Sequence, residues 1–375
     1  MKAKIENLLI ERFRGLRKIS INGLGRVNLI TGRNNNGKST VLEAIRLLAS
    51  DASPSVLLSI LVSREEGTEE MDDQTRPVDL GSGFQLSSLF QGFPEFSAHI
   101  EPIVIESSGG QNPMRLSIGM GWFSEERGSN GVRRLLTHQG NLFGEDDSLP
   151  GLVIEAGNTQ RIQPLDTLRK YLFRSRSFRS EPAEESRFPC IFVSPYGGER
   201  TATLGTLWDK IALSDLEKDI VEALRIISPG ISAVSMIGGE PPRRARTAIV
   251  KSVGFPRPVP LRSFGDGLNR LFGIILSLVN AKDGLLLIDE FENGLHYSIQ
   301  ADAWRAIFRL AKNLDIQVMA TSHSWDAIEA FQKVAGEESD DGVLIRLSHK
   351  GEDIIPTRFG KSELAVASRD RIEVR

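Results

Sequence analysis

The sequence predicts an α/β fold with a mostly parallel core sheet, an antiparallel β subdomain and a short helical insert. From residue 245 onward, strand, loop, helix, strand, helix and strand alternate, which is typical of a parallel sheet. Residues 97–165 hold short apolar runs between Gly, Ser and Asn clusters, a pattern that favours an antiparallel meander. Between an apolar run, VNLIT (27–31), and a helical pattern (38–49) stands the glycine-rich turn GRNNNGKS (32–39).

Composition is typical of a globular protein. Of the 375 residues 40% are hydrophobic and 25% charged, and the net charge is -3, so no overall basic character points to nucleic acid. The single cysteine, Cys190, forms no internal disulfide. The longest apolar run, LFGIILSLV (271–279), is too short to span a bilayer, and the first residues are too acidic for a signal peptide. We therefore expect a cytoplasmic protein with no membrane partner.

The N-terminal segment begins with two predicted strands. Residues 3–12 and 17–23 both place apolar side chains at alternate positions, and Arg14 and Gly15 lie at the turn between them. Further along, residues 63–84 are acidic and rich in turn formers, which predicts a mobile loop.

A helical pattern then separates the chain into two lobes. Residues 204–228 carry apolar side chains at helical spacing. The predicted organisation is an N-terminal lobe (1–203), a helical insert (204–235) and a C-terminal lobe (236–375).

The turn at 32–39 matches G-x-x-x-x-G-K-[ST], a cradle for nucleotide phosphates. Gly32 and Gly37 let the backbone curl so that its N–H groups and the helix N-terminus face the phosphates. Lys38 is expected to reach the β- and γ-oxygens, and Ser39 to ligate Mg²⁺. The alternative is a chance match in a Gly-Asn turn. The other residues predicted to contact the nucleotide here are Asn34, Asn35, Asn36 and Thr40.

Two carboxylates follow a second apolar run. The stretch GLLLIDEFENGLH (284–296) reads as a buried parallel strand, and ligands bind where such strands end. Asp289 is predicted to hold Mg²⁺, mostly through water, and Glu290 to polarise the attacking water. An ordinary strand end with its acids in solvent is the alternative.

Two further segments have the polarity expected of a phosphate site. LRSFGDGLNRLFGIILSL (261–278) is a glycine-rich turn before a helix, where Ser263 and Gly265 offer a hydroxyl and an N–H. IQVMATSHS (316–324) is a buried strand ending at His323, which can bond a γ-phosphate. Alone, these segments also suit a plain capped helix and a structural histidine. The four segments in this order are far more specific than any one of them.

In this arrangement the chain resembles the ABC-type ATPases, and most of all the stand-alone and OLD-family ATPases of bacteria, distant relatives of the SMC and RecF-like repair ATPases. The resemblance covers residues 1–50 and 190–375 well and the rest loosely. It implies an ABC-type P-loop ATPase head. The residues that carry it are FRGL (13–16), NLITGRNNNGKSTVLEAI (28–45), PLRSFGDGLNRLFG (260–273), LLLIDEFENGLH (285–296), QVMATSHS (317–324) and the closing RIEVR.

The family's roles carry over onto the matching positions. The resemblance assigns Lys38 and Ser39 to the Walker A motif and Asp289 and Glu290 to the Walker B motif. It implies a signature motif that completes the nucleotide site of the opposite subunit. The signature positions are Ser263, Gly265 and Gly267.

Other roles are implied less directly. Asn293 falls in the D-loop and His323 in the H-loop. Gln91, in SLFQGF, is our candidate for a Q-loop residue that senses Mg²⁺, with an ordinary surface glutamine as the alternative. Arg12 and Arg14 are candidates for contacts with the adenine or α-phosphate.

The resemblance thus predicts ATP and Mg²⁺ as cofactors and a head-to-tail homodimer that traps two ATP molecules, although sequence does not separate ATP from GTP. The signature departs from the transporter pattern, because Phe264 stands where those ATPases carry a small residue. No TOPRIM nuclease domain is expected, since only residues 324–375 follow His323.

The purpose of the ATPase stays open between three classes. One is a scaffold in anti-phage defence that holds a nuclease or toxin encoded as a separate chain. Another is a RecF-like or SMC-like ATPase that clamps DNA through basic clusters at 168–180 and 243–246, although these clusters also suit a solvated or partner-facing surface. The third, a transporter motor, needs a membrane partner and disagrees with the OLD-like signature and D-loop.

Overall fold

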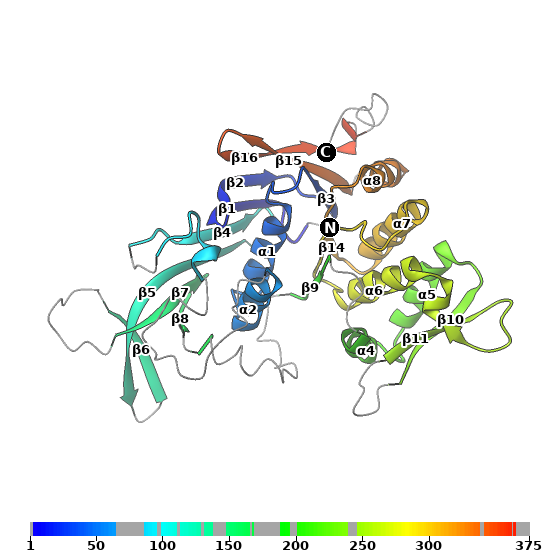
Figure 1. Cartoon of the computed structure of the whole chain (residues 1–375), viewed down its shortest axis with the longest axis horizontal. Helices are drawn as coiled ribbons and strands as arrows, with labels where there is room; N and C mark the ends of the chain where they lie inside the picture. Colours follow the sequence, from blue (N-terminus) through cyan, green and yellow to red (C-terminus); the bar gives the residue numbers. More distant parts are fainter. Residues whose placement is uncertain are drawn as a thin grey trace.

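The computed structural model shows two lobes joined by one central sheet (Figure 1). It describes residues 3–64, 86–95, 99–110, 113–128, 131–137, 148–165, 167–168, 188–195, 201–238, 246–337, 341–361 and 363–364. Most of the predicted loop at 63–84, the basic cluster at 168–180, residues 243–245 and the closing RIEVR lie outside the described residues.

The central sheet has six strands in the order β16-β15-β3-β14-β13-β9. The five strands from β15 to β9 pair in parallel, and β16 is antiparallel to β15. Because parallel strands end at one edge, the segments after β3, β9, β13 and β14 converge there. The strands are β3 (Val27–Thr31), β9 (Cys190–Val193), β13 (Leu285–Ile288), β14 (Gln317–Thr321), β15 (Gly342–Lys350) and β16 (Asp353–Phe359).

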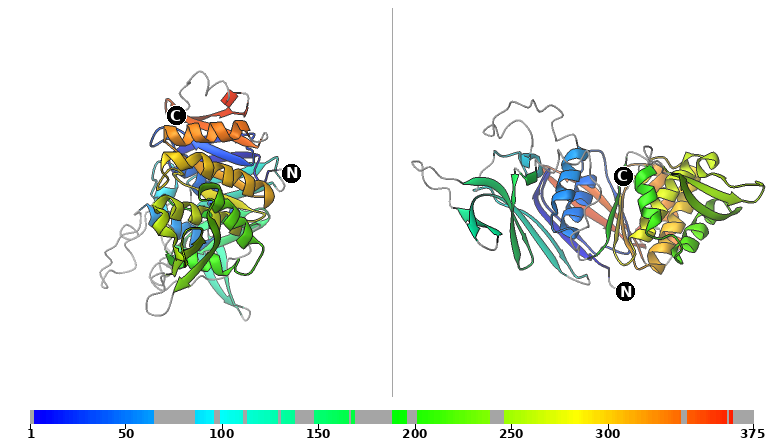
Figure 2. Two further views of the ribbon diagram at one scale, coloured as in Figure 1. Left: turned by 90° about the vertical axis from the view of Figure 1, so that its right-hand side faces the viewer. Right: turned by 90° about the horizontal axis from the view of Figure 1, so that it is seen from below.

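Both faces of this sheet are covered at its centre, so β3, β14 and β13 are buried throughout. On β13, Leu286 and Ile288 belong to the hydrophobic core of the C-terminal lobe, and Leu285 and Leu287 to the core of the N-terminal lobe. This alternation explains why a continuous apolar run such as LLLI forms a strand here. Seen from below, α1 and α2 lie between the two large sheets, and the remaining helices lie on the other side (Figure 2). The helices are α1 (Lys38–Ala49), α2 (Pro54–Ser63), α4 (Thr201–Asp209), α5 (Leu216–Ile227), α6 (Asp266–Asn280), α7 (Tyr297–Asn313) and α8 (Trp325–Glu337).

The N-terminal lobe adds an antiparallel sheet of seven strands, in the order β2-β1-β4-β5-β7-β8 with β6 beside β5. This agrees with the predicted hairpin and meander. The turn between β1 and β2 lies at Arg14 and Gly15, as expected. The strands are β1 (Asn7–Phe13), β2 (Leu16–Asn22), β4 (Ile103–Ser108), β5 (Met114–Gly128), β6 (Gly131–Thr137), β7 (Leu149–Ala156) and β8 (Thr159–Pro164). A short 3-10 helix, η1 (Leu86–Leu89), precedes Phe90.

The segment predicted as a helical insert is part of the C-terminal lobe. Helices α4 and α5 share its hydrophobic core with α6 and α7, through residues such as Trp208 and Leu224. From Ile231 the chain is strand rather than helix. The remaining elements are β10 (Ile231–Gly238), β11 (Arg246–Ser252), β12 (Val259–Pro260) and the 3-10 helix η2 (Leu261–Phe264).

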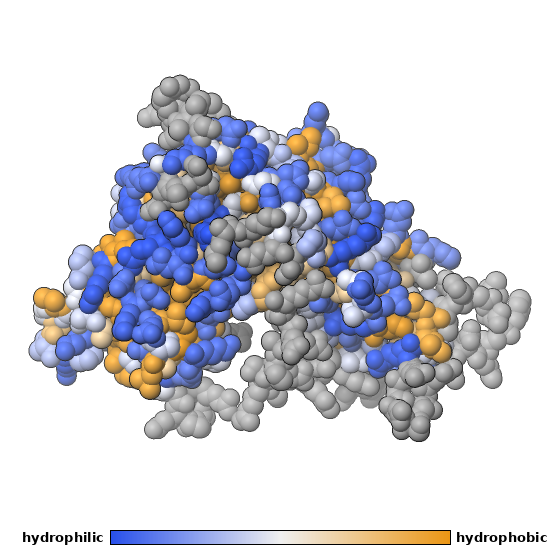
Figure 3. All heavy atoms as spheres, turned by 180° about the vertical axis from the view of Figure 1, so that it is seen from behind, coloured by the Kyte–Doolittle hydropathy of each residue, from blue (hydrophilic) through white to orange (hydrophobic). Residues whose placement is uncertain are grey.

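The face opposite to that of Figure 1 is mostly hydrophilic, with hydrophobic groups at its two ends (Figure 3). None of the helices described is both long and apolar enough to cross a membrane.

Candidate nucleotide site

The turn between β3 and α1 has the backbone shape that a phosphate cradle needs. Gly32, Asn35 and Gly37 have φ angles of 145°, 68° and 77°. A Cβ on Gly32 would lie 2.6 Å from the carbonyl oxygen of Leu347, and one on Gly37 would lie 2.9 Å from Leu16 Cδ2. Gly32 therefore requires glycine for space as well as for conformation, whereas Gly37 requires it for conformation, because the end of the Leu16 side chain can shift.

The first turn of α1 keeps its N–H groups available. Gly37 caps the helix without any side-chain hydrogen bond to it. Exposed N–H groups at a helix N-terminus attract anions. Asn34 and Asn35 are exposed and Thr40 is buried. Asn36 instead fastens the turn to β15, because its Nδ2 donates to the Leu347 carbonyl at 2.8 Å.

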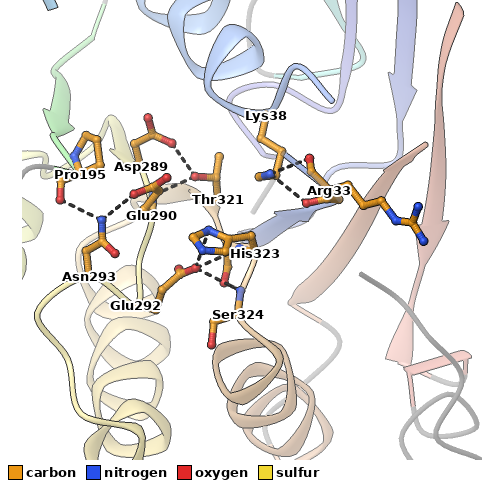
Figure 4. A network of polar contacts seen from close by, with 12 residues as sticks. Arg33, Lys38, Pro195, Asp289, Glu290, Glu292, Asn293, Thr321, His323 and Ser324 are labelled. Carbon is orange, nitrogen blue, oxygen red and sulfur yellow. Dashed lines mark hydrogen bonds and ion pairs between the residues drawn. The ribbon is translucent and has the colours of Figure 1, made fainter. Parts of the chain in front are cut away.

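Lys38 is buried within the turn that it serves. Its Nζ donates to the carbonyl oxygens of Gly32 at 2.8 Å and Arg33 at 3.0 Å (Figure 4). Burial lowers the pKa of Lys38, and the nearby carboxylates of Asp289 and Glu292 oppose that change. A phosphate would supply the negative charge and the acceptors that this buried ammonium favours.

Ser39 and Asp289 meet as predicted, although 250 residues separate them. Ser39 Oγ donates to Asp289 Oδ1 at 3.0 Å, and Thr321 Oγ1 donates to the same oxygen at 2.6 Å. In the described part of the chain no three His, Cys, Asp or Glu side chains gather as a metal centre. The oxygens of Ser39 and Asp289 suit Mg²⁺, which takes few protein ligands and otherwise binds phosphate and water.

Glu290 is held in a strained position beside this pair. Its φ is 48°, a value that non-glycine residues seldom adopt. Its N–H donates to Thr321 Oγ1 at 2.9 Å. Its Oε2 accepts from Asn293 Nδ2 at 2.5 Å, and Asn293 also donates to the Pro195 carbonyl at 3.0 Å. The D-loop residue therefore ties down the predicted catalytic carboxylate of its own chain (Figure 4).

The sequence reasoning missed Glu292, which organises the turn that carries His323. Its Oε1 accepts the N–H groups of His323 at 2.9 Å and Ser324 at 3.1 Å. His323 Nδ1 lies 3.1 Å from the same oxygen, and the Glu292 side chain is only 10% exposed. The signal available in the sequence was a third carboxylate after β13. What it contacts follows only from β13 and β14 being neighbours.

The signature segment lies apart from the cradle. No hydrogen bond or ion pair described joins residues 263–267 to the residues of the turn at 32–39. Gly265 has a φ of 104° and caps α6, and a Cβ on Gly267 would lie 2.9 Å from Ile299 Cδ1. Phe264, the departure from the transporter pattern, packs on Phe255 with ring centroids 5.6 Å apart.

Arg14 was predicted to reach the nucleotide and instead is buried in the N-terminal lobe. Its Nε lies 2.8 Å from Glu43 Oε2, and both side chains are 7% exposed. Removing one member of such a buried pair typically costs about 3–5 kcal/mol, so the pairing fixes Arg14 in place. Arg12 likewise donates to the Pro102 carbonyl at 2.7 Å.

Gln91 is not brought to the predicted metal pair. Its N–H donates to the Arg12 carbonyl at 3.1 Å. It lines a surface depression with Arg12 and residues of β2 and β16. Ser39 and Asp289 line a different cavity, which they share with Ser194 and Pro195 just after β9.

Two family models match the chain. Residues 206–328 match the model described as "AAA domain, putative AbiEii toxin, Type IV TA system", and residues 3–112 match the one described as "AAA ATPase domain". These matches indicate an ATPase of the AAA/ABC type. The matched segments include the Walker A turn, the signature, the Walker B carboxylates and His323.

Similar proteins are distant. A Helicobacter pylori protein named ATP/GTP phosphatase is 22% identical over 372 residues, which make up 96% of each chain. An uncharacterised protein of Methanocaldococcus jannaschii is 43% identical over 61 residues, 16% of this chain and 27% of that protein. A solved SMC head bound to the C-terminal winged-helix domain of ScpA has a TM-score of 0.52 at 12% identity, covering 96% of this chain and 99% of that one. The fold is thus a mixed α/β fold like that of an SMC head.

Proposed function

We propose that the protein is a Mg²⁺-dependent ATPase whose catalytic carboxylate is Glu290. The observation that carries this proposal is the meeting of Ser39, Asp289 and Glu290 at the mouth of the cradle. Ser39 comes from α1, and the two carboxylates come from the end of β13. A metal ligand pair, a base and a phosphate cradle in one place are the parts that phosphoryl transfer to water requires.

The contacts of the cradle indicate how binding would proceed. Lys38 would exchange the carbonyls of Gly32 and Arg33 for β- and γ-phosphate oxygens, at little cost since it is already positioned. When bound, Mg²⁺ would offset charge on the phosphate oxygens. Glu290 would orient the attacking water, which requires that its bond to Asn293 be released or shared.

We further propose that two chains associate head to tail around two nucleotides. No described hydrogen bond or ion pair joins the signature at 263–267 to the cradle of its own chain, and the signature presents a hydroxyl and a helix N-terminus. Asn293 would couple dimer formation to hydrolysis. It donates a hydrogen bond to the proposed catalytic carboxylate of Glu290, and by resemblance it belongs to the D-loop. Dimer closure that moves Asn293 would free Glu290 only when both subunits are in place.

The test is Glu290→Gln, which keeps the shape of the side chain but removes its basicity. With ATP and Mg²⁺ this variant should bind nucleotide, stay dimeric by light scattering, and hydrolyse about 100- to 10,000-fold more slowly. Glu329→Gln on the surface of α8 is the matched control. Normal hydrolysis by Glu290→Gln would exclude Glu290 as the base. Parallel titrations with ATP and GTP would identify the preferred nucleotide.

For the biological role we propose an ATP-controlled scaffold in anti-phage defence with a separate nuclease or toxin. The match of 206–328 to a model whose description includes a toxin system supports this role. A DNA-clamping ATPase is the second candidate, supported by the SMC-head fold. Of its basic clusters the described residues include Arg246, which forms an ion pair with Asp209.

A pull-down from the native host distinguishes the two roles. The bait is tagged Glu290→Gln with ATP and Mg²⁺, beside Lys38→Ala as the control that should not bind nucleotide. Enrichment of a nuclease or toxin would support the scaffold. Enrichment of repair factors or DNA, together with DNA-stimulated ATPase activity that falls steeply with salt, would support the clamp.

A further inference from the structure

The cavity at the metal pair is lined by charges of both signs: the arginines Arg46 and Arg64 and the carboxylates Glu43, Asp289 and Glu290. The cavity measures about 390 Å³ and extends along α1 from Ser39 to Arg46, two helical turns away. Asp289 and Glu290 line it at the end of β13, and Ser194 lines it after β9. Arg46 has no role in the cradle and was not singled out in the sequence.

Arg46 is a partly buried cation that forms no close ion pair among the described residues. Its guanidinium lies 4.2 Å from the ring centroid of Phe192, and its Nη2 donates to Ser59 Oγ at 2.7 Å. Within the described part of the chain no carboxylate lies within ion-pair distance of it. Burial lowers the pKa of Arg46, and the negative charges of Glu43 and Asp289 oppose that change. A guanidinium has five N–H donors, and the hydrogen bond to Ser59 uses one of them.

The neighbouring arginines show the contrast. Arg14 and Arg64 share the carboxylate of Glu43, at 2.8 Å and 2.7 Å from its two oxygens. Both oxygens of Glu43 are therefore taken by other cations. Since no described carboxylate forms a close ion pair with Arg46, a charge-assisted hydrogen bond to an anion in the cavity would stabilise its buried side.

We propose that this cavity binds inorganic phosphate, the product of hydrolysis, at Arg46. The inference rests on the proposed ATPase function and extends it to product release. Water attacks the γ-phosphorus and gives a proton to Glu290, the bond from that phosphorus to the bridging oxygen breaks, and ADP stays in the cradle. The released phosphate is then free to move along α1 from Ser39 toward Arg46, so it can leave without the cradle opening.

Titration of nucleotide-free protein with inorganic phosphate, followed by ³¹P NMR, tests the site apart from catalysis. Wild type and Lys38→Ala should both bind phosphate, because the cavity does not need the cradle lysine. Arg46→Gln should weaken binding roughly 10- to 100-fold, the range for loss of a charge-assisted hydrogen bond. Arg309→Gln removes an exposed arginine on α7 that pairs with Glu222, and it should bind phosphate like wild type.

The outcomes separate this inference from the proposed function. If Lys38→Ala loses phosphate binding, phosphate occupies only the cradle and the inference is wrong, whether or not Arg46→Gln folds. Equal binding by Arg46→Gln and wild type, or no binding by any variant, also overturns it. A wild type that binds phosphate but does not cleave ATP would instead overturn the proposed ATPase and leave an anion site of other purpose.

Discussion

The cradle and the signature segment are both glycine-rich turns that lead into helices, yet they differ in how complete they are. The cradle at 32–39 already has its lysine buried and its serine bonded to Asp289. The signature segment at 263–267 caps α6, and no hydrogen bond or ion pair among the described residues joins it to the cradle. The first is assembled by its own chain, whereas the second has the polarity of a phosphate site without any phosphate-binding partner beside it. If the proposed head-to-tail dimer is correct, this difference predicts that variants of the two turns will affect nucleotide binding and hydrolysis separately.

The largest loss of ATP binding and hydrolysis is expected from a substitution in the cradle. Lys38→Ala should abolish tight ATP binding and reduce hydrolysis on the order of 1,000-fold, because the charge that positions the γ-phosphate is lost. Isothermal titration and a steady-state phosphate assay measure the two losses, with Lys251→Ala on β11 as the control. Wild-type affinity in Lys38→Ala would mean that the turn is not the nucleotide site.

A substitution in the signature segment should affect hydrolysis but not ATP binding. Ser263→Arg is expected to leave ATP binding intact and to reduce hydrolysis about 100-fold, because the signature would act only on the partner's nucleotide. An equimolar mixture with Lys38→Ala should recover roughly a quarter of wild-type activity, since random pairing gives half heterodimers, each with one intact site. No recovery, despite heterodimers detected by native mass spectrometry, would contradict the head-to-tail arrangement.

Contacts between residues close in the sequence were predictable, and contacts between residues far apart in the sequence were not. The turn and the helix after it were predictable, because they are contiguous in the sequence, whereas the bond of Asn36 to the Leu347 carbonyl was not. Glu292 was missed because its partners, His323 and Ser324, follow a neighbouring strand that only the sheet order places beside it. Arg14 was misassigned for a similar reason, since its partner Glu43 lies on α1.

Gln91 is a residue that local sequence placed at the site and that the structure places elsewhere. It was chosen from a local stretch, SLFQGF, whereas the segment that reaches the Walker B carboxylates is Ser194–Pro195. Ser194 and Pro195 lie beside these carboxylates because β9 pairs in parallel with β13. The sequence of β9 does not indicate which strand it pairs with. The core strands were predictable as elements, and their order, which builds the site, was not.

A smaller effect is expected from Glu292, which connects the Walker B turn to the His323 turn. Glu292→Ala should lower kcat about tenfold with KM little changed, because two backbone N–H groups lose their acceptor and His323 loses its position. Glu292→Gln keeps one acceptor oxygen and should restore most of kcat. Failure of glutamine to rescue would show that the negative charge matters rather than the positioning of the turn.

The smallest expected effect is on the free energy of unfolding, which the burial of Lys38 in the cradle makes dependent on pH. Burial lowers the pKa of Lys38 below its value in the unfolded chain, so between these two pKa values the unfolded state binds more protons than the folded state. The free energy of unfolding of the nucleotide-free protein should therefore rise with pH in that alkaline window. Lys38→Met, which cannot titrate, should lack this contribution, and the difference between the two proteins in urea unfolding at several pH values isolates it. Saturating ATP should remove the difference, because a bound phosphate stabilises the charged lysine. Parallel pH dependences in the two proteins without nucleotide would mean that Lys38 is not strained by burial and that the cradle, like the signature, is completed only by its ligand.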